Sequence, residues 1–197
     1  MESMIGMGLA LVIAGYLLGA VPFGLLVARA MGGRDPRSGG SGNIGATNVA
    51  RLAGKTAGVL TLLLDIGKGL GPAMLADYWL TPWWAGAVGL AAFVGHCWPV
   101  YLRFKGGKGV ATFLGVLLGL APWAGLATGL VLILLATVTK HMSLGSLVGC
   151  GSSVGWLWLA GAPVAYLVMA AVMTLLVFYK HRENIVRLRA GQEHGWR

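Results

Sequence analysis

The sequence contains few charged residues and very few acidic ones. Charged side chains make up 11% of the 197 residues, and Asp and Glu together number only 6 against 15 Lys and Arg. A water-soluble domain needs a polar surface, and a chain that is 57% hydrophobic cannot supply one. This composition excludes an ordinary soluble enzyme and predicts an all-α integral membrane protein.

Cysteine is also scarce. Cys97 and Cys150 are the only two, and no CxxC or Cys/His ligand spacing surrounds either of them. This excludes a disulfide framework and a zinc site built on cysteine. Because both lie in apolar runs, we expect them to be small packing residues, and we expect no metal or cofactor.

Long uncharged runs occupy most of the chain, at residues 3–28, 78–102, 109–139 and 141–179. A membrane span needs about 20 apolar residues, so the last two runs are long enough for two helices each. Pro122 and the Gly161-Ala-Pro163 break divide them near their middles. The predicted order is seven transmembrane helices in a single domain over residues 1–197, at about 4–30, 56–76, 84–102, 109–121, 122–139, 144–160 and 163–180.

The distribution of basic residues predicts how these helices are oriented. With hairpins in both long runs, fourteen of the fifteen Lys and Arg residues fall on one side. The positive-inside bias makes that side cytoplasmic, with the N-terminus outside and the C-terminus cytoplasmic. The net charge of +9 is then a basic rim that faces anionic membrane lipids, and nucleic acid is not expected as a partner. The first run lacks a basic leader and a clear cleavage site, so we expect a retained helix.

The first of three polar stretches covers residues 38–51, between two apolar runs. Its glycines permit backbone N–H groups to point into one concavity that suits an anion. Arg51 adds a guanidinium that fits phosphate oxygens. The candidate ligands are Ser41, Gly42, Asn43, Thr47, Asn48 and Arg51. The alternative is a polar loop that only connects two helices.

The second stretch covers residues 95–112 and alternates lysine with glycine just before a predicted helix. Backbone amides at a helix N-terminus together with ammonium groups commonly bind phosphate. The GxxxxGK[ST] spacing of a Walker A loop is absent. The candidates are His96, Lys105, Gly106, Gly107, Lys108 and Gly109. A histidine at a helix end is otherwise often a packing residue, and that alternative applies to His96.

The third stretch is split between residues 140–146 and 180–188. His181 and Asn184 lie three residues apart on a helix expected to continue past the last span, so they share one face, and Ser146 lies in the preceding turn. A basic membrane anchor is the alternative, although it does not explain the histidine and asparagine.

Asp65 and Lys68 have the same spacing inside a span, where they form either a structural ion pair or a support beneath the polar loops.

All three stretches are expected on the cytoplasmic face, and they strongly resemble the three motifs of the bacterial PlsY family. The matching segments are residues 41–51, 95–112 and 181–193. The family comprises acyl-phosphate-dependent glycerol-3-phosphate acyltransferases. The resemblance implies transfer of a fatty acyl group from acyl phosphate to the sn-1 hydroxyl of glycerol 3-phosphate, which gives lysophosphatidic acid and phosphate. It also implies a bacterial inner-membrane location, a cytoplasm-facing site and a functional link to a soluble enzyme that produces acyl phosphate.

The resemblance also implies roles for the candidate residues. Ser41, Arg51, Lys108, His181 and Asn184 are expected to be catalytic, and the other candidates to bind substrate, with the glycine-rich second motif holding glycerol 3-phosphate. Glu193 is expected to be structural. The His-x4-Asp pattern of the soluble-type glycerolipid acyltransferases is absent, because no histidine is followed by aspartate five positions on. The candidate proton acceptors are therefore His96, His181 and a phosphate oxygen of the substrate. We favour the phosphate oxygen, with direct attack of the hydroxyl on the acyl group. The competing hypothesis is a transporter for a phosphorylated anion.

Overall fold

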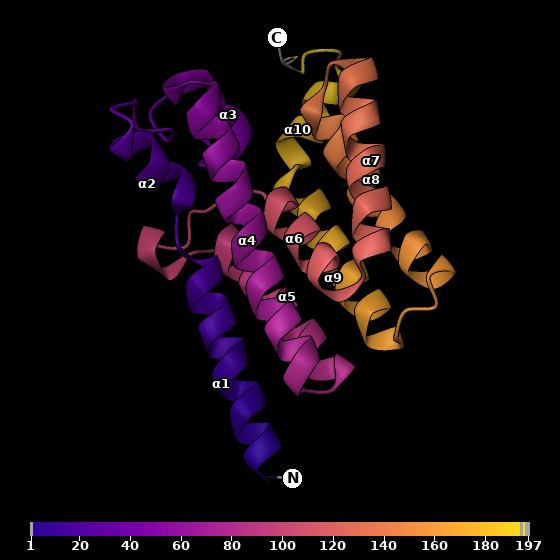
Figure 1. Ribbon diagram of the computed structural model, residues 1–197. Helices are drawn as coiled ribbons and strands as arrows, with labels where there is room; N and C mark the ends of the chain where they lie inside the picture. Colours follow the sequence, from indigo (N-terminus) through magenta and orange to yellow (C-terminus); the bar gives the residue numbers. More distant parts are fainter. Residues whose placement is uncertain (1, 194, 196–197) are drawn as a thin grey trace.

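The computed structural model describes residues 2–193 and 195, and that part of the chain is helical, with no strand. Figure 1 shows the helices packed as a bundle, with the start of α1 and the helix α10 at opposite ends. The elements are α1 (Glu2–Gly19), α2 (Phe23–Ala30), α3 (Ala46–Ala53), α4 (Lys55–Trp79), α5 (Pro82–Cys97), the 3-10 turn η1 (Val100–Leu102), α6 (Val110–Leu120), α7 (Pro122–Thr139), α8 (Met142–Leu159), α9 (Val164–Lys180) and α10 (Arg182–Arg189).

Two of the long apolar runs fold as the hairpins predicted from their breaks. Pro122 is the first residue of α7, directly after α6 ends, and Pro163 precedes α9 after α8 (Met142–Leu159). Proline is favoured at such helix starts because its missing N–H would have no partner there. The predicted helices at 109–121, 122–139, 144–160 and 163–180 therefore agree with α6 to α9 within about two residues.

The described residues contain four helical segments long and apolar enough to cross a membrane, or five if the bent pair α9 and α10 counts as one span. The four are residues 2–30, 55–79, 82–102 and 122–139. Helix α6 has only 11 residues, which at 1.5 Å per residue is about half of a 30 Å hydrocarbon core. The integral membrane class is confirmed, whereas a count of seven full spans stays a prediction.

The predicted helix at about 4–30 corresponds to one candidate span over residues 2–30. Within that span the helix is interrupted: α1 ends at Gly19 and α2 starts at Phe23, because Pro22 has no N–H to continue the helical hydrogen bonds. The first polar stretch also differs from a simple loop, since its second half forms α3. The helix expected to continue past the last span bends by 62° at His181.

Glycines on both partners permit close contact between helix backbones. A Cβ on Gly19 of α1 would lie 2.0 Å from the carbonyl oxygen of Ala92, and one on Gly95 of α5 would lie 2.3 Å from the carbonyl oxygen of Tyr16. Neither position has room for a side chain. This small-residue packing is typical of membrane helices, where lipid supplies no hydrophobic drive for association.

The buried core lies where α5, α6 and α9 meet. Phe93 and Phe113 pack edge to face with ring centroids 6.2 Å apart, and Met173 of α9 is fully buried in the same cluster. Cys97 and Cys150 are buried free thiols, which confirms them as packing residues. This rigid core fixes the helix ends from which the polar stretches extend.

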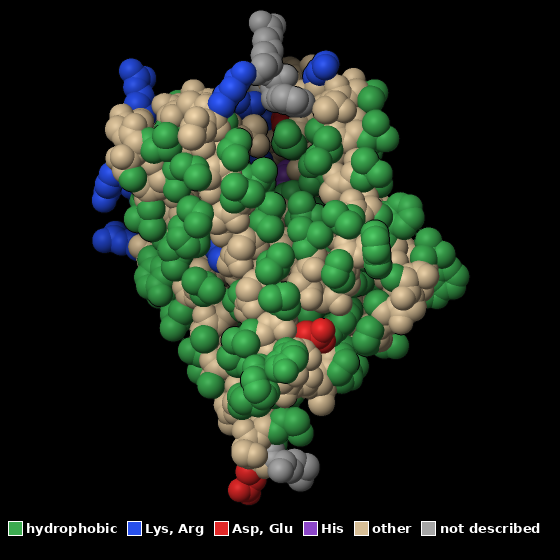
Figure 2. Space-filling model, viewed as in Figure 1, with side chains coloured by type: hydrophobic (Ala, Val, Ile, Leu, Met, Phe, Trp, Pro, Cys, Tyr) green, Lys and Arg blue, Asp and Glu red, His purple; other side chains and the backbone are tan. Residues whose placement is uncertain are grey.

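Charge is distributed unevenly along the bundle. Figure 2 shows Lys and Arg side chains around the end that carries α2, α3 and α10, while on the visible face the opposite end shows acidic side chains and no Lys or Arg. We call the first end the basic end. A hollow opens there, with histidine and acidic side chains visible inside it.

Candidate active site

Asn48 organises the first polar stretch. It is 2% exposed, and its amide nitrogen donates to the carbonyl oxygens of Pro36 (2.7 Å) and Asn43 (2.9 Å), while its Oδ1 accepts from the backbone N–H of Ser41 (2.9 Å). A Cβ on Gly40, where φ is +58°, would lie 2.1 Å from that Oδ1. Asn48 therefore holds the loop in shape through backbone contacts, and the glycine is required where the loop passes over it.

The other candidates of this stretch lie around that clamp. Asn43 accepts from the N–H of Gly45 (2.8 Å), which shapes the turn before α3. Thr47 is half-buried and Arg51 is exposed, both on α3, and neither makes a side-chain hydrogen bond or ion pair within residues 2–193. Ser41 is exposed in the loop. The structure thus leaves the Arg51 guanidinium available to an anion.

The second polar stretch forms a tight turn between α5 and α6. Its backbone folds back on the end of α5, because the N–H of Gly107 donates to the carbonyl oxygen of His96 (3.1 Å). Gly109 precedes α6 with φ +85°, and a Cβ there would lie 2.2 Å from the Phe93 ring. The predicted helix start directly after the lysines is confirmed, and buried rings hold the turn against the core.

Lys108 joins the second polar stretch to the third. Its Nζ donates to Asn184 Oδ1 at 2.5 Å, and the Asn184 Nδ2 donates to Glu193 Oε1 at 2.6 Å. Glu193 also accepts from Arg187 Nε at 2.8 Å. Burial lowers the pKa of the Lys108 ammonium below its usual value, and the nearby Glu193 carboxylate opposes that change. These contacts fix which way the Asn184 amide faces.

His181 lies at the bend between α9 and α10 and is 3% exposed. Its Nδ1 is 2.8 Å from the carbonyl oxygen of Val177, so Nδ1 carries the proton and Nε2 is the acceptor in the neutral ring. Burial, and then the Lys108 charge, lower the pKa of His181 to about 4. Ser146 is buried on α8 and donates to the Met142 carbonyl oxygen at 2.8 Å, so its hydroxyl already has one partner.

A pocket of about 370 Å³ lies between the first and second polar stretches. Gly42, Lys105 and Gly106 line it, together with Arg37, Ile44, Phe104 and Lys180. Lys180 is anchored there by a hydrogen bond from Nζ to the Cys97 carbonyl oxygen at 3.0 Å. Arg37 is paired with Asp35, whose pKa the guanidinium lowers to about 2, so Lys105 and Lys180 supply the positive charge that lacks a carboxylate partner in the described structure.

The glycine turn therefore presents its two lysines to different neighbours. Lys105 faces the pocket beside Gly42, whereas Lys108 contacts Asn184 of α10. Each side combines cationic groups with nearby backbone amides, which is the chemistry that binds phosphate. The arrangement can hold two anions, one on each side of the turn.

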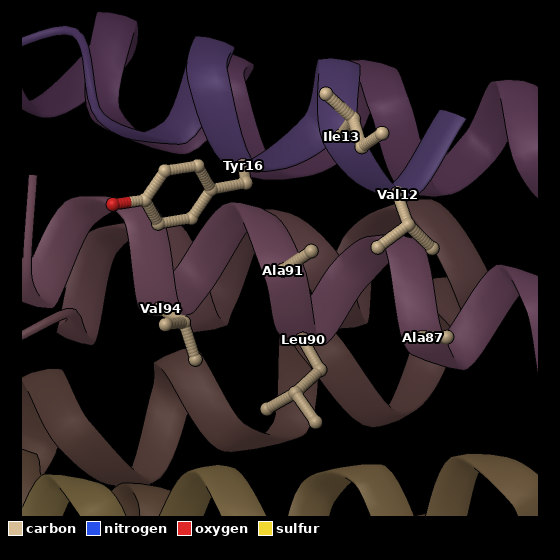
Figure 3. Close-up of a pocket in the computed structure, with 7 residues that line it drawn as sticks. All are labelled: Val12, Ile13, Tyr16, Ala87, Leu90, Ala91 and Val94. Carbon is tan, nitrogen blue, oxygen red and sulfur yellow. The ribbon is translucent and has the colours of Figure 1, made fainter. Parts of the chain in front are cut away.

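An apolar groove of about 430 Å³ runs between α1 and α5, away from these charges. Figure 3 shows its lining residues, Val12, Ile13 and Tyr16 on α1 and Ala87, Leu90, Ala91 and Val94 on α5. The Tyr16 hydroxyl donates to the Trp98 carbonyl oxygen at 2.9 Å, just before η1. This groove has the chemistry of a hydrocarbon surface, and no charged side chain lines it.

Sequence reasoning missed several residues at the site. Lys180 directly precedes His181, and its place at the end of an apolar run was the signal that could have identified it. Ile44 and Phe104 line the pocket but are ordinary apolar residues in the sequence. Asp65, expected either as an ion-pair partner or as a support, lies 3.6 Å from His96 Nδ1 as well as 2.8 Å from Lys68.

The chain is similar to known proteins along most of its length. The family model described as glycerol-3-phosphate acyltransferase matches residues 9–191. A glycerol-3-phosphate acyltransferase of Myxococcus xanthus is 50% identical over 181 residues, covering 91% of this chain and 94% of the relative. One of Ruegeria pomeroyi is 51% identical, with coverage of 92% and 89%.

Two solved structures are similar along nearly the whole chain. The crystal structure of PlsY, an integral membrane glycerol 3-phosphate acyltransferase, in its glycerol 3-phosphate form is 44% identical, with a TM-score of 0.93 and coverage of 97% of this chain and 96% of that one. Its lysophosphatidic acid form is 42% identical, with a TM-score of 0.90 and the same coverage.

The fold and the site define an integral membrane acyltransferase whose polar site lies at one end of a helical bundle. The chain belongs to the glycerol-3-phosphate acyltransferase family, of the PlsY type, as its motifs predicted. It is an acyltransferase of phospholipid synthesis.

Proposed function

We propose that the protein transfers a fatty acyl group from acyl phosphate to the sn-1 hydroxyl of glycerol 3-phosphate, releasing lysophosphatidic acid and inorganic phosphate. The observation that carries this proposal is the glycine turn, with Lys105 on a pocket beside Gly42 and Lys108 against Asn184. A reaction between two phosphorylated molecules needs two anion sites close together. The similar structures in glycerol 3-phosphate and lysophosphatidic acid forms support the acceptor and the product.

The roles of the side chains follow from their charge and position. The five residues proposed as catalytic divide by their chemistry, because an activated acyl phosphate requires chiefly positioning and charge stabilisation. Arg51, Lys108 and Ser41 stabilise negative charge on the reacting groups. Asn184 positions Lys108, and His181 presents Nε2 as an acceptor. The groups proposed to hold the substrates are Gly42, Asn43, Thr47, Asn48, His96, Lys105, Gly106, Gly107, Gly109 and Ser146. Among these, Asn48 acts through the loop that it holds, since its amide is committed to backbone atoms.

The chemical step proposed is direct attack. The sn-1 hydroxyl oxygen bonds to the acyl carbonyl carbon, the bond from that carbon to the phosphate oxygen breaks, and a phosphate oxygen takes the hydroxyl proton. A phosphate dianion, with a second pKa near 6, is basic enough for this. His181, neutral with Nε2 as its acceptor, is the alternative proton acceptor. A trapped acyl-enzyme on Ser41 or Ser146 would refute direct attack.

The membrane arrangement is part of the proposal. The basic end faces the cytoplasm of a bacterial inner membrane, the chain acts as one domain with seven membrane helices, and the N-terminus is outside. A water-soluble glycerol 3-phosphate then enters from the cytoplasm, while the hydrocarbon of acyl phosphate stays in the bilayer, where the groove between α1 and α5 offers apolar surface. A soluble acyl-phosphate-producing enzyme is the functional partner.

The deciding experiment is an acyl transfer assay on purified protein. Incubation with palmitoyl phosphate and radiolabelled glycerol 3-phosphate should produce labelled lysophosphatidic acid, and palmitoyl-CoA in place of palmitoyl phosphate should produce none. Product from palmitoyl-CoA alone would refute the proposed donor. Uptake of the label into proteoliposomes, with no lysophosphatidic acid formed, would refute the reaction and favour transport of a phosphorylated anion.

A further inference from the structure

Asp65 and Lys68 form a buried ion pair inside the transmembrane helix α4. Their side chains are 3% and 2% exposed, and Lys68 Nζ lies 2.8 Å from Asp65 Oδ1. Lys68 Nζ also donates to the Val21 carbonyl oxygen at 2.9 Å, at the break between α1 and α2. A charged pair in a membrane helix is costly and commonly marks a functional position, so its surroundings are informative.

The carboxylate of Asp65 faces the imidazole of His96 on the neighbouring helix α5. Asp65 Oδ1 and His96 Nδ1 are 3.6 Å apart, and His96 is 4% exposed. Within the described residues Nδ1 has no hydrogen-bond partner, although it is fully buried. Hydrogen bonds of this kind are often long in ligand-free sites and shorten when substrate binds. A proton on Nδ1 that points toward Asp65 leaves Nε2 as an acceptor.

The other edge of the same imidazole lies against the glycine turn. A Cβ on Gly107 would be 2.1 Å from His96 Nε2, so the ring is in direct contact with that residue. The N–H of Gly107 also donates to the backbone oxygen of His96 at 3.1 Å. One histidine therefore touches the turn with both its side chain and its backbone, while its opposite edge faces a membrane-buried carboxylate.

We propose that Asp65 is a positioning residue: it fixes the tautomer and orientation of the His96 imidazole, and through it the shape of the turn that carries Lys105 and Lys108. Lys68 holds the carboxylate in place through their 2.8 Å ion pair. This rests on the proposed function, because the anion that the turn holds is taken to be glycerol 3-phosphate. The membrane helix α4 thus sets the affinity of a water-facing phosphate site.

A purely structural ion pair would behave differently. Replacing both partners of a buried pair with apolar residues of similar size is often neutral or stabilising, because desolvation offsets the attraction. Under that alternative an apolar replacement folds and binds substrate normally. A positioning role requires an acceptor at residue 65, and the loss of that acceptor frees the imidazole to turn.

The test uses two double variants that differ only at residue 65. In Asp65→Leu/Lys68→Met the acceptor and the charges are gone, and the KM for glycerol 3-phosphate should rise by about tenfold to a hundredfold, the change in affinity when one hydrogen bond to a charged phosphate is lost. In Asp65→Asn/Lys68→Met an amide oxygen of nearly the same shape restores the acceptor, and KM should return close to the wild-type value. In both variants kcat should change little. Tyr166→Phe, which removes a polar contact with Asp77 elsewhere in the protein, is the control and should leave KM unchanged.

Nitrogen NMR of histidine-labelled wild-type protein gives a readout that does not depend on the folding of the residue 65 variants. The His96 signal, assigned by its loss in His96→Ala, should show a neutral ring protonated on Nδ1. Equal KM values for the Leu and Asn variants, a fall in kcat with KM unchanged, or a ring protonated on Nε2 would each overturn the proposal. If wild-type protein makes no lysophosphatidic acid, the proposed function fails, and the NMR spectrum still decides the role of Asp65.

Discussion

Replacing Gly107 with alanine tests the packing of the glycine turn with a single methyl group. The added Cβ would lie 2.1 Å from His96 Nε2, 2.9 Å from Cε1 and 3.0 Å from Cδ2. Carbon and nitrogen atoms in ordinary contact are about 3.5 Å apart, so the ring or the turn must move by about 1.4 Å. The imidazole is buried and the turn is bonded to the His96 backbone, so neither can move freely.

The added methyl group should destabilise the folded protein, because overpacking a filled site lowers the free energy of unfolding by about 1–3 kcal/mol. If the turn moves, its two lysines move with it and lose part of their interaction with the transition state. A loss of about 1.4 kcal/mol of transition-state stabilisation lowers catalytic efficiency tenfold. The catalytic efficiency with glycerol 3-phosphate should therefore fall by about fivefold to a hundredfold or more. Gly107 has an ordinary negative or extended backbone angle, so the effect comes from the methyl group and not from backbone strain.

The assay is the initial rate of lysophosphatidic acid formation at varied glycerol 3-phosphate, with the melting temperature in detergent measured alongside. Gly67→Ala is the matched control, because a Cβ there meets nothing within 4 Å on the surface of α4, and it should keep full activity. Adding His96→Ala to Gly107→Ala removes the clash and should restore the melting temperature toward that of His96→Ala alone. Wild-type rates for Gly107→Ala would refute the described contact between the turn and the imidazole.

Other changes test the cations, the buried histidine and the helix contacts. Arg51→Ala and Lys108→Ala should each abolish turnover while the melting temperature stays near that of the wild type, and near-normal rates for either would refute its role on phosphate. The pKa of His181 is about 4 when folded and ordinarily 6.5, so its contribution to stability is complete above pH 6.5 and is lost as pH falls toward 4. That contribution amounts to about 3 kcal/mol, so the melting temperature should fall more steeply over this range in wild type than in His181→Gln. Gly115→Ala should lower the free energy of unfolding by about 1–3 kcal/mol, and the melting temperature with it. The reason is that a Cβ there would lie 2.0 Å from the Ile66 carbonyl oxygen, between α6 and α4.

The sequence predicted much of the architecture because apolar runs and prolines act locally. Pro122 and Pro163 determine where helices begin whatever the rest of the chain does, and the structure confirms both starts. The break at Pro22 was also visible in the sequence, inside the apolar run at 3–28, and the structure has it between α1 and α2. Hydropathy reports the environment around a segment and not the continuity of its hydrogen bonds, so the apolar run indicated the span and the proline indicated its interruption.

The site was predictable to a lesser extent. Glycine next to lysine and hydroxyl groups next to arginine indicated anion binding at Lys105, Lys108 and Arg51. The spacing of Asp65 and Lys68 placed both on one helix face and left open an ion pair or a supporting role; the structure shows the ion pair. No sequence pattern showed that Asn48 binds backbone atoms of Pro36, Ser41 and Asn43, because these partners are defined only when the loop closes over it.

The sequence by itself determined that the protein lies in a membrane, that it is helical, which family it belongs to and which residue types can hold phosphate. These properties depend on composition and on short contiguous motifs. Only the tertiary structure decided which motif meets which: Lys108 with Asn184, 76 residues apart, and Asp65 with His96 from different helices. Such contacts depend on how the helices cross and rotate about their axes. That geometry comes from the packing of many small residues at once, and no single stretch of sequence encodes it.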